Sequence, residues 1–198
     1  LYTLDELILS KNSIECIQQN AFKDLQNLRL LSLENNQITE LPDFVFEPLK
    51  NLKELRLFNN KLEAINSNTF KGLYNLEVLV MFSNRLDTLD TNTFQDLKNL
   101  DVLYIYENQI RTLASNCFKG LNKLRALSLF GNDIDSFDPF LLNGLENLQT
   151  LFLDVEDQND LPQIMLLYQK HKKILEKEDA SHSKYSNSNA NKKTKDLK

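Results

Sequence analysis

The chain repeats itself every 24 residues, and this period limits its fold more than any other feature. The stretch from Leu76 to Asn99 returns when it is shifted by 24 residues in either direction. Two series mark the copies most clearly, one of asparagines and one of phenylalanines: Asn12, Asn36, Asn60, Asn84, Asn108 and Asn132; Phe22, Phe46, Phe70, Phe94 and Phe118. A unit this short cannot bury its apolar side chains alone, so the copies must stack into a solenoid.

Six complete units with the pattern L-x-x-L-x-L-x-x-N-x-L fill residues 4–147. A seventh unit begins at Leu148 and degenerates over residues 148–160, because Glu156 stands at its Asn position. We therefore assign residues 1–160 to one repeat array. Leu1, Tyr2 and Thr3 match the end of a further unit, so we expect the chain to be a fragment of a longer protein.

Each unit predicts one short strand whose leucines point into the solenoid, because alternate strand residues face opposite sides. Strands of successive units should pair in parallel, with the return half of each unit covering one face. The recurring Asn has amide donors and an acceptor for backbone groups where the chain leaves the strand, which predicts a structural asparagine ladder. The recurring Phe should stack as a buried spine on the opposite, convex side.

These units resemble the typical 24-residue leucine-rich repeat, and nearly every motif position is kept in six tandem copies. The subclass is similar to the extracellular arrays of Toll and Toll-like receptors, chaoptin-like proteins and related arthropod secreted or surface proteins. The resemblance implies an α/β fold: a right-handed, curved solenoid with a parallel sheet on its concave face and an irregular or short-helical convex side. It also implies an extracellular place and a role in innate immune recognition, adhesion or development.

The C-terminal part has two different compositions. Residues 161–178 carry apolar residues at three- and four-residue spacing, which predicts an amphipathic helix. This helix would cap the last repeat, and a short coiled coil with a partner chain is the alternative. Residues 179–198 are rich in Ser, Asn and Lys and have no apolar run, so we expect a disordered tail.

Two columns of side chains should face outward from the sheet. Successive side chains within a column are one repeat apart. The column just after the last buried Leu contains Phe58, Phe82, Tyr106 and Phe130, and the column within the strands contributes Tyr104 and Phe152. These six residues form the predicted aromatic patch, and polar residues stand at its rim: Arg56, Lys61, Arg85 and Glu107. An exposed aromatic patch with a polar rim is typical of a protein-binding hot spot. The alternative is that the rings only stack on neighbouring strands and stiffen the sheet.

No catalytic or cofactor site emerges from the residues. The two histidines, His171 and His182, lie outside the array, so no nucleophile there has a base and an orienting group. Metal ligands are not clustered with suitable spacing, because the acidic run at Asp154, Glu156 and Asp157 lacks the glycine and spacing of a calcium loop. We predict a protein that is not an enzyme and needs neither metal nor cofactor.

Charge and hydropathy exclude further classes. The net charge is −5 and the isoelectric point is near 5.2, which argues against nucleic acid as the main partner. Residues 169–198 hold nine Lys against four acidic residues, so they carry +5 and the rest of the chain −10. No apolar run is long enough to span a membrane. Cys16 and Cys117 belong to distant units, so we expect two unpaired, half-buried thiols.

Three functional hypotheses follow. The first is a protein-binding module of a secreted or cell-surface protein, with the partner on the aromatic patch. The second is a structural or adhesive protein whose array self-associates, for example as a homodimer. The third is an intracellular scaffold or regulator, which stays open because cysteine caps and Asn-x-Ser/Thr glycosylation sites are missing from the sequence.

Overall fold

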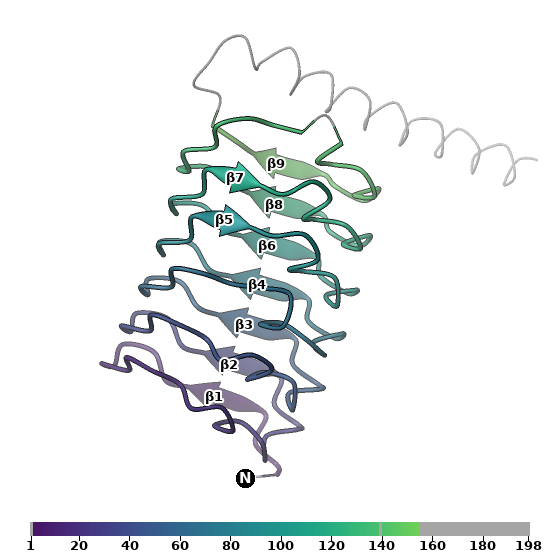
Figure 1. Ribbon diagram of the computed structural model, residues 1–198. Coiled ribbons are helices and arrows are strands. Elements are labelled where there is room, and N and C mark those ends of the chain that lie inside the picture. Colours follow the sequence, from purple (N-terminus) through teal and green to yellow (C-terminus); the bar gives the residue numbers. More distant parts are fainter. Residues whose placement is uncertain (1, 139, 155–198) are drawn as a thin grey trace, which may run out of the picture.

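The computed structural model describes residues 2–138 and 140–154, which form a solenoid of stacked turns (Figure 1). Each turn contributes one three-residue strand to a seven-stranded parallel sheet along one side of the stack. The strands follow one another in the order β1 (Glu6–Ile8), β2 (Leu30–Ser32), β3 (Glu54–Arg56), β4 (Val78–Val80), β6 (Val102–Tyr104), β8 (Ala126–Ser128) and β9 (Thr150–Phe152). The predicted repeat solenoid is therefore confirmed.

The register of the sheet equals the sequence period. Leu79 of β4 lies opposite Leu55 on one side and Leu103 on the other, each 24 residues away. A buried leucine stands at the centre of the strands β2, β3, β4, β6 and β8. Because each repeat meets an identical neighbour, one spacing of leucines fixes the pairing of the whole sheet.

The return segments consist of successive turns. Leu97 N–H, for example, donates to Phe94 C=O three residues earlier. Equivalent turns begin at Phe46, Phe70 and Phe118. A second parallel sheet pairs β5 (Thr88–Leu89) with β7 (Thr112–Leu113) on the way back. Within residues 2–138 and 140–154 these segments are irregular and contain no helix, so no helix there is long and apolar enough to cross a membrane.

The phenylalanine series forms a continuous spine inside the return side. The rings stack nearly parallel, with centroids 5.9, 6.4, 6.0 and 6.1 Å apart along the series. Phe46, Phe70, Phe94 and Phe118 are almost completely buried. Leu142 takes the place of the ring in the sixth repeat and is also buried.

The two cysteines differ in environment, and both are unpaired. Cys117 is buried, and so are Val45, Thr69 and Thr93, which occupy the equivalent position in three earlier repeats. Burial raises the pKa of its thiol to about 12. Cys16 is exposed, so the expectation of a half-buried residue there is wrong, because its position is that of the exposed Glu40 on the outer turn.

The predicted capping helix at 161–178 and the tail at 179–198 lie outside the described residues. The degenerate seventh unit is described only as far as Asp154.

Candidate functional site

The outer surface of the seven-stranded sheet, called here the sheet face, is the candidate site. The residues of its aromatic column lie two positions after the end of each strand. Backbone hydrogen bonds join successive residues of the column, which are one repeat apart. Asn59 N–H donates to Phe82 C=O and Ser83 N–H to Tyr106 C=O, both at 3.1 Å. The residue after each column position then turns the chain away from the sheet.

That turn uses a left-handed backbone in six consecutive repeats. The residues before the ladder asparagines all have φ between 51° and 68°: Lys11, Asn35, Asn59, Ser83, Glu107 and Gly131. Only the glycine and the two asparagines are types that adopt this conformation readily. Backbone hydrogen bonds from Ser83 N–H to Tyr106 C=O and from Glu107 N–H to Phe130 C=O hold these two residues in this conformation.

The ladder asparagines hold the turns together. Asn84 Oδ1 accepts from Leu62 N–H at 3.1 Å, and its Nδ2 donates to Leu57 C=O and Met81 C=O. The buried members repeat this arrangement one turn apart: Asn36, Asn60, Asn84, Asn108 and Asn132. Asn12 is exposed and bonds only to Leu9 and Ser10 of its own turn.

Three of the six patch aromatics form a tight stack. The centroids of Phe58 and Phe82 are 4.5 Å apart and those of Phe82 and Tyr106 are 4.4 Å apart, with the planes within 10° of parallel. All three side chains are half-buried. Each ring therefore covers the face of the next, and the edges of the rings point away from the sheet.

The other three patch residues surround one end of this stack. Tyr104 lies 6.3 Å from Tyr106 with its plane tilted by 60°. Phe130 and Phe152 are 52% and 55% exposed, and Phe130 forms no ring pair with another aromatic residue in the described part of the chain. The sheet face thus has an ordered stack in its centre and exposed rings toward β9.

The polar residues at the rim have unequal roles. Arg56 Nε donates to Glu54 Oε1 at 2.6 Å, and this hydrogen bond is the main reason that the pKa of Arg56 is raised. Glu107 Oε2 accepts from Ser83 Oγ at 2.6 Å. Lys61 Nζ bonds Gln37 at 3.0 Å, and the exposed Arg85 lies with Glu63 and Asp87 around a polar hollow on the flank. Arg56 therefore stands within the sheet face, whereas Lys61 and Arg85 lie beyond its border.

Burial is the first cause of a raised pKa at Tyr106, and the negative charge of Glu107 is the second. The acidic groups near Arg56 also include Glu6 and Glu34. A third outward column consists of the first residue of each strand, from Glu6 to Thr150, beside the two columns of the aromatic patch. Over these three outward columns the sheet face carries four acidic residues against one basic residue, Arg56: Glu6, Glu34, Glu54 and Asp154. The sheet face is therefore aromatic in its centre and negatively charged around it.

A second asparagine series was overlooked in the sequence. The Nδ2 groups donate to a backbone carbonyl 25 residues earlier, at distances of 2.5–3.0 Å: Asn27, Asn51, Asn75, Asn99 and Asn147. The sequence does contain the signal for this series, because five of the six complete units end on this Asn. The exception is the fifth unit, which ends on Lys123. This series ties the outer turns together just before the strands.

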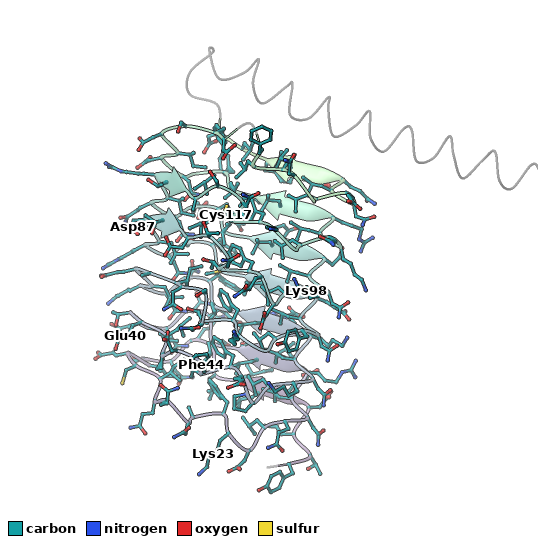
Figure 2. All side chains as sticks on the ribbon, turned by 45° about the vertical axis from the view of Figure 1, so that its right-hand side comes forward. Lys23, Glu40, Phe44, Asp87, Lys98 and Cys117 are labelled. Atoms are coloured by element: carbon teal, nitrogen blue, oxygen red, sulfur yellow. The ribbon has the colours of Figure 1, made fainter. Side chains whose placement is uncertain are left out.

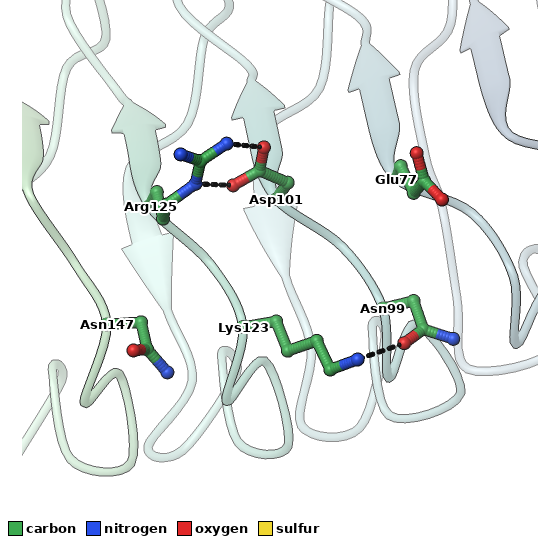
Figure 3. Close-up of a pocket in the computed structure, with 6 residues that line it drawn as sticks. All are labelled: Glu77, Asn99, Asp101, Lys123, Arg125 and Asn147. Carbon is green, nitrogen blue, oxygen red and sulfur yellow. Dashed lines mark hydrogen bonds and ion pairs between the residues drawn. The ribbon is translucent and has the colours of Figure 1, made fainter.

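The flank beside that series holds a polar pocket of about 400 Å³ (Figure 3). Arg125 donates through Nε and Nη2 to both carboxylate oxygens of Asp101 at 2.5 Å, which lowers the pKa of Asp101. Lys123 Nζ donates to Asn99 at 2.7 Å. Glu77 bonds Lys53 of the preceding repeat, so each charged group that lines this pocket has a hydrogen-bond partner in a neighbouring repeat. Among the described residues no group of His, Cys, Asp or Glu side chains is arranged to hold a metal ion.

The comparisons with known proteins agree with this architecture. A family model described as leucine rich repeat matches residues 2–62, 27–86, 50–110 and 75–134. The structure of TLR13 in complex with ssRNA13 is similar over 76% of this chain, with 34% identity and a TM-score of 0.62. Drosophila Toll in complex with Spatzle matches 66% of the chain, with 30% identity and a TM-score of 0.61.

A leucine-rich repeat protein of Leptospira interrogans matches 75% of the chain, with 31% identity and a TM-score of 0.66. These matches span 25%, 19% and 37% of the respective solved chains, so this chain covers well under half of each. No curated protein matches the sequence. With overlapping matches over residues 2–134 and an observed solenoid of the same period, the chain belongs to the leucine rich repeat family.

Proposed function

We propose that this chain is a non-enzymatic recognition module of a secreted or cell-surface protein, and that it binds a protein partner on its sheet face. The aromatic patch carries the proposal: a stack of Phe58, Phe82 and Tyr106 that continues into exposed rings at Phe130 and Phe152. The repeat pattern requires no aromatic residue at these positions. The buried phenylalanine spine already supplies the aromatic core.

The exposure of the patch favours binding over a purely stiffening role. Stacking on neighbouring strands accounts for Phe58, Phe82 and Tyr106, but it leaves Phe130 and Phe152 more than half exposed. A contiguous aromatic surface with a polar border is the composition of an interface centre. The similarity to Toll, solved with Spatzle and described as a hub in development and innate immunity, and to TLR13, solved with ssRNA13, supports a role in ligand recognition.

A protein partner fits this surface better than a nucleic acid does. Bases bind to aromatic side chains by stacking on ring faces, and in the central stack neighbouring rings cover both faces of Phe82 and one face each of Phe58 and Tyr106. The acidic residues around the patch would also repel phosphates. Apolar side chains, in contrast, pack well against ring edges.

The test compares one double variant with a matched control. Partners are captured on the immobilised chain from the extracellular fluid and cell surface of the source organism, and the Kd of each candidate is then measured with purified protein. Phe82→Ala with Tyr106→Ala should weaken binding by at least 100-fold, because it removes the centre of the patch. Tyr74→Ala, at an exposed tyrosine of a return segment, should leave the Kd within twofold.

Equal binding by the wild type and the double variant would refute the proposed site, provided that the variant keeps the cooperative unfolding transition. Light scattering at micromolar concentration examines the alternative. A concentration-dependent dimer that the double variant abolishes would show that the patch serves self-association.

A further inference from the structure

The central stack ends at Tyr106, and this end differs from the rest of the column. One face of Tyr106 is covered by Phe82 at 4.4 Å. On its other side lies the next turn, where Phe130 is 52% exposed and forms no ring pair in the described part of the chain. Tyr106 is thus the last member of the stack, with one face not taken by another ring and with the tilted Tyr104 beside it.

Negative charge gathers at the same place. Glu107 directly follows Tyr106, at a turn residue with φ of 51°, and it is exposed. Its carboxylate lies close enough to act on Tyr106 and has one hydrogen-bond donor in the structure, Ser83 Oγ. A carboxylate has about four lone-pair sites, so Glu107 keeps acceptor capacity for a partner. No basic side chain of the three outward columns stands nearer than Arg56, two repeats away, and Glu54 already pairs with Arg56.

We propose that the protein partner inserts an arginine side chain against the free face of Tyr106, between Tyr104 and Phe130, with Glu107 as its counter-ion. This inference rests on the proposed function and specifies the chemistry of the partner. A cation is attracted to the face of an aromatic ring and not to its positively polarised edge. The stack has two ends, Phe58 and Tyr106, and each has one face without a neighbouring ring. The positively charged Arg56 lies in the same repeat as Phe58, so Tyr106 is the end that favours a cation.

Arginine fits this place better than lysine. Its planar guanidinium stacks on an aromatic face and at the same time presents two parallel N–H donors to a carboxylate. Apolar residues of the same partner segment would contact the ring edges of Phe82 and Phe58, one and two repeats away. The partner epitope is thus a basic residue next to apolar residues, matching an acidic rim beside an aromatic stack.

The experiment observes the tyrosine rings directly by NMR, with ¹³C-labelled tyrosine in the full chain at physiological salt. N-acetyl-arginine amide is titrated as the probe, and N-acetyl-citrulline amide serves as its neutral, nearly isosteric control. Tyr106→Phe assigns the Tyr106 resonance. Arginine amide should shift the Tyr106 and Tyr104 signals saturably, and citrulline amide should bind at least fivefold more weakly.

Glu107→Gln should weaken the arginine response at least threefold, because it removes the charge and keeps the size of the side chain. Glu63→Gln, at an exposed glutamate away from the sheet face, should leave the response unchanged. Equal shifts by arginine and citrulline amides, an unchanged response in Glu107→Gln, or an equally strong shift of Tyr74 would each overturn the proposal.

The two proposals fail in different ways. If a partner loses binding to Phe82→Ala with Tyr106→Ala but binds Glu107→Gln as tightly as the wild type, the proposed function stands and the arginine contact is refuted. If arginine amide shifts Tyr106 while every partner binds the double variant normally, the contact exists and the proposed binding surface is refuted.

Discussion

Replacing Asn84 by alanine tests how the ladder asparagines stabilise the array. The side chain is buried and makes four hydrogen bonds: Oδ1 accepts from Leu62 N–H, and Nδ2 donates to the carbonyls of Leu57, Met81 and Phe82. All three carbonyls keep a second donor: Asn60 Nδ2 also donates to Leu57 C=O and Asn108 Nδ2 to Met81 C=O. Asn59 N–H likewise donates to Phe82 C=O. Among residues 2–138 and 140–154 the Leu62 N–H has no other partner, so the substitution leaves one buried donor unsatisfied.

The magnitude follows from that count. An orphaned buried N–H costs about 1–3 kcal/mol, and each of the other lost hydrogen bonds adds about 0.5–1.5 kcal/mol, reduced here by the remaining donors. We expect Asn84→Ala to lower the free energy of unfolding by about 2–4 kcal/mol. For a chain of this size that corresponds to a decrease in Tm of about 5–15 °C.

The assay is urea and thermal unfolding followed by circular dichroism and tyrosine fluorescence. Asn12→Ala is the matched control, because Asn12 is exposed and bonds only to carbonyls that water can reach. It should cost less than about 0.5 kcal/mol, as exposed hydrogen bonds contribute little. Equal losses at positions 12 and 84, or a loss below 1 kcal/mol at position 84, would refute the argument from buried backbone groups.

Three further predictions concern the return segments, where Phe44 and Cys117 lie (Figure 2). Phe94→Ala should cost about 3–5 kcal/mol in urea unfolding, whereas Phe94→Leu should cost less than half of that, since Leu142 fills the same position naturally. Phe44→Asn should stabilise the chain by about 1 kcal/mol in the same assay. Phe44 has a φ of 62°, a left-handed conformation that most L residues disfavour, and Asn92 and Asn116 adopt it at the equivalent positions. A loss of stability would contradict this. At pH 8 Cys16 should react with a maleimide and Cys117 should not, as counted by mass spectrometry, because the pKa of the buried thiol is about 12; modification of Cys117 in the folded chain would disprove its burial.

The sequence alone predicts the scaffold because every repeat places the same residue in the same environment. Leu79, Asn84 and Phe94 each belong to a series of equivalent residues, so one exception within a series does not obscure the pattern. The register of the sheet follows from the 24-residue period without further information. The helix predicted at 161–178 has no such series behind it and lies outside the described residues.

The details of the site depend on interactions that the pattern does not encode. Glu107 and Ser83 give no sequence signal for a left-handed backbone, because the hydrogen bonds of the turn impose it. Ser32 and Ser128 belong to an outward column but are buried, since short side chains between longer neighbours are covered by them. The sequence likewise placed six aromatics in one patch but gave no indication that three stack face to face and three do not.

The curvature of the solenoid explains why the stacked rings of the sheet face lie closer together than those of the buried spine. Equivalent rings of the buried spine are 5.9–6.4 Å apart, whereas those of the sheet face are 4.4–4.5 Å apart. The same repeat thus advances less on the sheet side, so the stack bends toward the sheet and brings its outward side chains to contact distance. Rings at this spacing cover one another's faces. A column of aromatic side chains on such a surface therefore offers ring edges along its length and ring faces at its two ends. The proposed arginine contact uses the end at Tyr106, which is the one farther from Arg56.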